Sequence, residues 1–173
     1  MTGSPYLPRP LQRFLCLLLA ALSCTATQGQ FVRDAQSECE QLMNSALPLA
    51  KQMLREHGEF FPFGVALNAK GQVVAVATGL EHEQPTSEDL IRQLKQIFRA
   101  QATAGEYRAT ALTFDARLRT PAKGMMVDAI AVALDHRDNY SVVVFLPYRL
   151  EREKLTLGDM FAQEGAGEVF RHR

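Results

Sequence analysis

Apolar residues recur at helical spacing between Ser37 and His57. This spacing of three and four residues is typical of an amphipathic helix. The stripe consists of Cys39, Leu42, Met43, Ala46, Ala50, Met53 and Leu54. Ser37 and Glu40 stand at the positions of a capping box, and Gly58 suits a C-terminal cap. The pattern predicts a helix from Ser37 to about His57, which Pro48 is expected to kink.

After this helix, apolar residues recur at every second position instead of every third or fourth. Apolar and small residues alternate over residues 60–67, turn residues follow at 68–71, and residues 72–78 form a matching strand. A polar loop over residues 79–85 precedes a second amphipathic segment, residues 86–105, which Thr86 opens with capping-box chemistry. The sequence therefore predicts a hairpin followed by a second helix.

Three strand-like segments follow, at residues 107–118, 126–136 and 141–148. Their connections are short and turn-like, which predicts an antiparallel meander. Within the last segment, Val142–Leu146 is apolar on both faces. Such a strand is either covered on both sides or presents a surface to a partner.

The predicted order is helix, two strands, helix, three strands, with a short helix over Thr156–Phe161 as an optional addition. This order predicts a single α+β domain over residues 34–161, in which two main helices flank a five-stranded antiparallel sheet. No internal repeat or low-complexity linker divides the chain. Residues 162–173 are expected to form a flexible tail.

The element order over Asp34 to Phe161 resembles the profilin-like and roadblock-like α/β domains, in which helices flank a five-stranded antiparallel sheet. This resemblance is one of topology and rests on no sequence motif. The segments Glu59–Gly64 (EFFPFG) and Phe145–Tyr148 (FLPY) are similar to segments of a group of small bacterial proteins of uncharacterised function. The second resemblance implies no activity for any residue.

Residues 1–26 have the arrangement of a secretory signal peptide. Arg9 and Arg13 precede an apolar run over residues 14–22, and small residues fit cleavage after Ala26. A membrane-spanning helix needs about 20 apolar residues, so this run is too short for an anchor. The sequence predicts export to the periplasm or secretion, with no transmembrane segment in the mature chain.

A lipoprotein is the alternative to simple cleavage. Ala21–Cys24 resembles a bacterial lipobox, with Cys24 as the residue that would carry the lipid. Cleavage after Ala26 would instead leave Cys39 as the one remaining cysteine, so no intramolecular disulfide could form. Because Cys39 lies on the apolar stripe of the first helix, we expect it to be buried.

Composition and charge exclude several classes of protein. The chain is 47% hydrophobic and 22% charged, which is ordinary for a globular domain and unlike a disordered or collagen-like chain. Its 19 basic and 19 acidic residues balance. Because no Lys/Arg cluster is present, we expect no nucleic-acid partner.

None of the familiar spacings for metals, nucleotides or covalent catalysis occurs. The four histidines, His57, His82, His136 and His172, stand apart from one another, and no C-x-x-C pair is present. A Gly-rich phosphate loop and a G-x-S-x-G motif are also missing. We therefore expect no cofactor and no metal.

An enzyme remains the second functional hypothesis. Asp128 and His136 fall on one predicted strand, and His136 stands between Asp135 and Asp138. A histidine beside carboxylates is a general-base pattern, which would suit a small hydrolase-like enzyme. A solvated turn with local ion pairs explains the same residues without catalysis.

Small residues line one side of several predicted strands. The set is Gly64, Ala66, Ala75, Ala77, Ala109, Ala111, Ala129, Ala131 and Ala133. Such a face lets a helix approach closely, which is the packing interpretation. The functional interpretation is a shallow apolar pocket roofed by helices, as in a small-molecule sensor.

The densest aromatic cluster supplies the candidate binding surface. Phe61 and Phe63 are expected in the core, whereas Phe60 is expected near an edge, because three such residues cannot all point inward. Together with Tyr148 they form the predicted surface. The sequence thus favours an exported binding domain without catalytic activity, whose partner is a small molecule or a protein, a second copy of this chain included.

Overall fold

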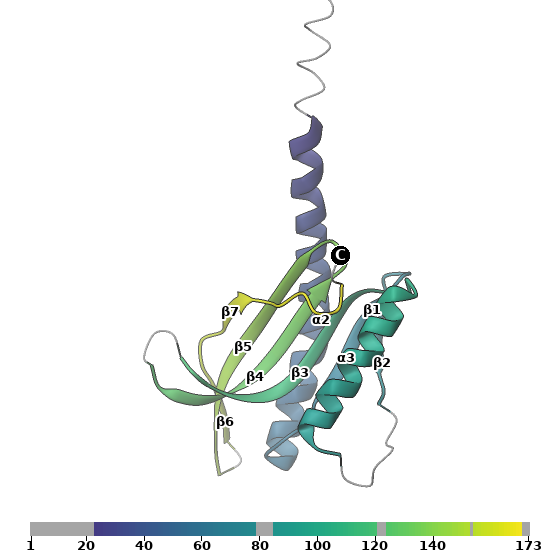
Figure 1. The fold of residues 1–173 in the computed structure, drawn as a ribbon. Coiled ribbons are helices and arrows are strands. Elements are labelled where there is room, and N and C mark those ends of the chain that lie inside the picture. The colour runs from purple at the N-terminus through teal and green to yellow at the C-terminus, as the bar shows by residue number, and fades with distance from the viewer. Residues whose placement is uncertain (1–22, 79–84, 121–123, 153, 171–173) are drawn as a thin grey trace, which may run out of the picture. The chain divides into compact units, whose positions relative to one another are not determined.

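The computed structural model describes residues 23–78, 85–120, 124–152 and 154–170 (Figure 1). The chain divides into two compact units, Met1–Asp34 and Ala35–Arg173. Residues 23–34 of the first unit are helical. The second unit contains every described strand and the helix between the strands.

The described residues form two helices and seven strands. In chain order these are α2 (Ser23–His57), β1 (Phe63–Asn68), β2 (Val73–Val76), α3 (Ser87–Thr103), β3 (Tyr107–Arg119), β4 (Met126–His136), β5 (Tyr140–Glu151), β6 (Lys154–Leu157) and β7 (Phe161–Glu164). The strands are antiparallel in the order β2-β1-β3-β4-β5-β6, and β7 also pairs with β5.

The α+β class is confirmed, but the predicted five-stranded sheet and its element order are wrong. The chain adds β6 and β7 after β5, and the predicted terminal helix over Thr156–Phe161 is instead the end of β6, a connection and the start of β7. Both strands pair with β5, where its main-chain groups would otherwise lack partners. Where the sequence predicts a tail from residue 162, residues 162–164 belong to β7.

The start of α3 is confirmed, whereas that of α2 is wrong. Thr86 caps α3: its side chain accepts the N–H of Asp89, and the Asp89 carboxylate accepts the N–H of Thr86. In contrast, Ser37 lies inside α2, which starts at Ser23 and continues through Pro48. Residues 23–36 contain one glycine and no proline, so no strong stop signal precedes the predicted cap.

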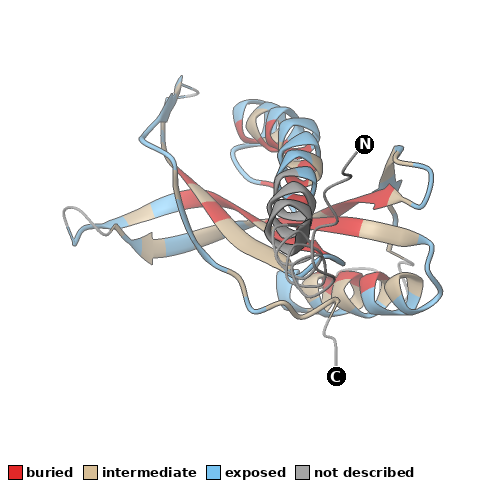
Figure 2. Cartoon of the chain, turned by 90° about the horizontal axis from the view of Figure 1, so that it is seen from above, coloured by how far each residue is buried: buried red, intermediate tan, exposed pale blue. Residues whose placement is uncertain are grey.

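Buried residues line the sheet and the sides of the helices that face it (Figure 2). From Ala35 on, α2 packs on one face of the sheet in a core that includes Leu42, Leu54, Ile130 and Leu146. On the other face, α3 packs through Leu94 and Phe98 in a smaller core.

Small strand residues let both helices approach the sheet closely. Ala109 and Ala111 are fully buried in the core beneath α2. At Gly64, an added Cβ would lie 2.7 Å from Cζ of Phe98 on α3. This contact is shorter than those that real Cβ atoms make, so a side chain at position 64 would have to displace Phe98 and loosen the packing of α3 on β1.

Candidate functional site

The predicted aromatic surface is only partly present. Phe60 is buried and packs edge-on against Phe63, with ring centroids 6.1 Å apart. Phe61 is instead 63% exposed. The prediction reversed these two residues because β1 starts at Phe63, so the alternation of a strand does not extend back to Phe60. Phe60 and Phe63 therefore offer little surface to a partner.

Tyr148 of β5 is half-buried and fixed by a hydrogen bond. Its hydroxyl donates to the carboxylate of Asp115 on β3, with both carboxylate oxygens 3.0 Å away. Desolvation raises the pKa of Asp115, and burial beside that carboxylate raises the pKa of Tyr148 well above its usual range. Tyr148 is thus held as a neutral donor, and its ring stays in one place.

A groove of about 460 Å³ lies beside Tyr148. Three segments line it: the end of the β3–β4 hairpin, residues 147–149 of β5, and the chain from β6 to β7. Most of its lining is apolar. The apolar lining residues are Met125, Val127, Pro147, Leu157, Met160 and Phe161. We call this the hairpin groove.

Main-chain and ring contacts hold the walls of the hairpin groove. The N–H of Gly158 donates to the carbonyl of Pro147 at 2.8 Å, which fixes the chain between β6 and β7 against β5. Phe161 of β7 stacks on Phe145 with ring centroids 5.3 Å apart. The groove is therefore built on paired strands, which position a site more precisely than free loops do.

The lining of the hairpin groove has two features that a closed surface would avoid. Met125, Leu157 and Met160 are large apolar residues that remain exposed. Thr120 also lines the groove, and in the described part of the chain no partner accepts or donates a hydrogen bond at its buried Oγ1. A buried hydroxyl without a partner is costly and uncommon in folded proteins.

A second polar cluster joins the first helix to the sheet. His136 of β4 is 2% exposed, and its Nε2 lies 2.8 Å from Oε2 of Glu38 on α2. Arg108 of β3 forms an ion pair with the same carboxylate. On the other side of the ring, Nδ1 of His136 accepts the N–H of Asp138 at 3.0 Å.

These contacts leave no ring nitrogen of His136 for a substrate. Because Nδ1 accepts a main-chain N–H, the proton of the neutral ring is on Nε2, which donates to Glu38. Burial lowers the pKa of His136 and favours this neutral form. The cluster therefore ties α2 to β3 and β4, and a general base would have to break one of these bonds.

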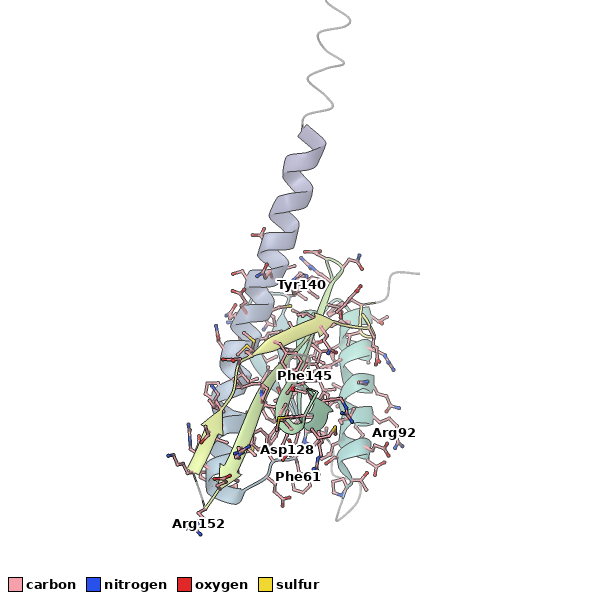
Figure 3. All side chains as sticks on the ribbon, turned by 90° about the vertical axis from the view of Figure 1, so that its left-hand side faces the viewer. Phe61, Arg92, Asp128, Tyr140, Phe145 and Arg152 are labelled. Carbon is pink, nitrogen blue, oxygen red and sulfur yellow. The ribbon has the colours of Figure 1, made fainter. Side chains whose placement is uncertain are left out.

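Asp128 and His136, the pair of the enzyme hypothesis, do not converge. They are eight residues apart on β4, which corresponds to roughly 26 Å along a strand. In Figure 3, Asp128 and Tyr140, the cross-strand partner of His136, lie toward opposite ends of the sheet. Asp128 is exposed and its charged neighbour is Arg117, at 3.9 Å.

The remaining candidates divide between exposed positions and undescribed ones. His57 is exposed at the end of α2. His82, His172 and most of the predicted signal peptide lie outside the described residues, as does the side chain of Cys24. Within the described ranges, no group of three or more metal-ligating side chains is placed to hold an ion.

In the part of the chain that the structure describes, no helix is both long enough and apolar enough to cross a membrane.

No protein-family model, curated protein or solved structure matches the chain. The resemblance to profilin-like domains is therefore untested, and the five-stranded sheet on which it was based is not the sheet of this chain, which has seven strands. The geometry of the described residues is the basis for any functional assignment.

The sequence did not indicate most of the residues that line the groove or form the polar cluster. Glu38 and His136 are 98 positions apart, and Thr120 and Met160 line one groove only because strand pairing brings their segments together. The one sequence signal for this groove was the presence of methionines beside a predicted turn, since methionine is frequent at adaptable binding surfaces.

Proposed function

We propose that this protein is an exported binding domain that takes a small, mostly apolar molecule with one hydrogen-bonding group in the hairpin groove. The observation that carries the proposal is the combination of exposed Met125, Leu157 and Met160 with the hydroxyl of Thr120, which has no hydrogen-bond partner among the described residues. An apolar ligand would cover the three side chains, and its polar group would satisfy the hydroxyl.

The size of the groove supports a small molecule as the occupant. Its volume of about 460 Å³ falls within the roughly 300–1,000 Å³ of ordinary ligand sites. Such sites are apolar with a few placed polar groups. Tyr148, the one member of the predicted aromatic surface that lines the groove, provides an aromatic wall whose orientation Asp115 fixes.

A role in binding is also consistent with the polar clusters. His136 uses both ring nitrogens within the fold, and Asp128 stands at the far end of the same strand. Neither arrangement favours the hydrolase-like alternative. Export is supported by Arg9 and Arg13 ahead of the apolar run and by small residues near Ala26.

The experiment is a titration of the mature protein with 1-naphthol, a two-ring apolar probe with a single hydroxyl. Binding is measured by the fluorescence of the probe. Met160→Asp places a charge in the groove and is expected to weaken binding at least about tenfold. Leu49→Asp is the matched control, because Leu49 on α2 is 44% exposed and Met160 is 46% exposed. This control should bind the probe as the unmodified protein does.

Thr120→Val tests the polar contact separately. Valine keeps the shape of threonine and removes the hydroxyl, so binding of 1-naphthol should weaken while binding of naphthalene does not. The proposal fails if the unmodified protein binds neither probe, or if Leu49→Asp and Met160→Asp have equal effects. A dimer that Met160→Asp converts to a monomer would assign the groove to a second copy of the chain instead.

A further inference from the structure

A second cavity, which shares no lining residue with the hairpin groove, lies on the α3 face of the sheet. Its volume is about 190 Å³, and its walls come from α3, β3, β4, β5 and the segment Gly165–Val169. Most of the wall is apolar, including Ile91, Phe98, Leu112, Phe114, Ala133 and Val143. Ala133 belongs to the small-residue strip that the sequence associated with either helix packing or a pocket.

The segment Gly165–Val169 crosses this cavity and is tied on both sides. Toward the sheet, the N–H groups of Gly165 and Gly167 donate to the carbonyl and the hydroxyl of Ser141, at 3.1 and 3.0 Å. Toward α3, Arg99 donates to the carbonyl of Glu168, and the Glu168 carboxylate pairs with Lys95 at 2.8 Å. The segment thus forms one wall of the cavity.

Among the described residues, Asp135 is the charged group of the cavity without an ion-pair partner. It is buried on β4, and its Oδ2 accepts the N–H of Val169 at 2.8 Å. In the described ranges, no Lys or Arg side chain forms an ion pair with it, since the ammonium of Lys95 is engaged by Glu168. Burial raises the pKa of Asp135 above its usual value, which reflects the cost of a desolvated carboxylate.

We propose that this cavity binds a small apolar amine, whose ammonium group pairs with the Asp135 carboxylate and whose apolar body fills the space beneath Gly165–Val169. Two observations support this class of ligand. The apolar walls and the buried carboxylate are parts of one cavity, and a cation beside that carboxylate would offset the cost of burying it.

The volume limits the ligand to about one aromatic ring. An apolar cavity of about 150 Å³ in another protein holds benzene, and this cavity is slightly larger at about 190 Å³. Benzylamine is a ring with one short cationic arm and is therefore a suitable probe. Toluene and benzoate are its neutral and anionic counterparts of similar size.

The test is a titration of the mature protein with each probe. Binding is measured through the amide NMR signals of Gly167 and Val169. Benzylamine should shift both signals, because its ammonium group competes with or polarises the Asp135–Val169 contact. Toluene should bind at least about tenfold more weakly, and benzoate should not bind. Asp135→Asn keeps an acceptor for the Val169 N–H and removes the charge, so benzylamine should then bind no better than toluene.

Several results would overturn the proposal. Equal affinity for toluene and benzylamine would show that the carboxylate does not select the ligand, and so would undiminished benzylamine binding to Asp135→Asn. Absence of any shift with the unmodified protein would exclude this ligand class. If Asp135→Asn does not fold, the comparison of the three probes on the unmodified protein still decides. Met160→Asp should leave benzylamine binding unchanged, which separates this site from the hairpin groove.

Discussion

The imidazole of His136 and the carboxylate of Glu38 meet at 2.8 Å between Nε2 and Oε2, and this contact connects the middle of α2 to β4. Arg108 holds the same carboxylate from β3. Because both ring nitrogens are engaged, the contact is expected to affect the stability of the fold and its dependence on pH.

Acidification is expected to destabilise the protein through His136. Burial lowers the pKa of His136 in the folded state, so the unfolded chain takes up a proton first as the pH falls through about 6.5. The free energy of unfolding should therefore decrease between about pH 7.5 and about pH 5.5, as measured by urea denaturation. His136→Gln should reduce this slope, whereas His57→Gln, at an exposed histidine, should keep it. An unchanged slope in His136→Gln would contradict the assignment.

Removal of the charge of Glu38 is expected to destabilise the fold. Glu38→Gln leaves the half-buried Arg108 guanidinium without its carboxylate and should cost about 2 kcal/mol in the free energy of unfolding. Glu40→Gln, two positions further along the exposed side of α2, is the matched control and should change stability little. Urea denaturation of Glu38→Gln, Arg108→Gln and the double variant should show less than additive losses; strictly additive losses would argue against a direct pair.

Gly64→Ala is expected to force α3 away from β1. The new Cβ would lie 2.7 Å from Cζ of Phe98, and overpacking of this kind costs about 1–3 kcal/mol. The double variant Gly64→Ala, Phe98→Leu should recover part of the loss, because leucine vacates the space that Cβ needs. If Gly64→Ala unfolds at the same urea concentration as the unmodified protein, α3 does not pack as closely as described.

Cys39 is expected to resist thiol reagents in the folded protein. The residue belongs to α2 and is buried in the core between this helix and the sheet. Desolvation raises the pKa of its thiol to about 12. Because the thiolate is the reactive form, labelling of the mature chain should be slow under native conditions and rapid in urea. Cys39→Ala should leave ligand binding largely intact. Rapid native labelling would contradict the burial.

The mature chain is expected to begin between Cys24 and Phe31. The charged, apolar and small residues of the first 26 positions carry this prediction. Intact-mass measurement of protein recovered from its producing cell decides it. A chain that still starts at Met1 would be evidence against export, and an added lipid mass on Cys24 would establish the lipoprotein alternative.

Local patterns predicted the elements well where the residues that define an element are adjacent in sequence. The cap of α3 needs only Thr86 and Asp89, and its prediction is confirmed. Long-range pairing explains the errors. The residues of β6 and β7 carry little period of their own and become strands because β5 offers them partners. The sequence did not predict the hairpin groove for the same reason, because its lining residues come together only after the strands have paired.

Two short strands share one edge of β5, and their pairing matters for a chain that has not yet folded. Residues 141–147 read SVVVFLP, an uncharged run rich in β-branched and aromatic residues, and such a run at an open edge promotes aggregation. In the folded domain β7 pairs with Val142–Phe145 and β6 with Tyr148–Glu151. Pairing with β6 and β7 therefore protects this edge of β5 from association with other chains, and a nascent or clipped chain that lacks these strands would expose residues 141–147 at an open edge.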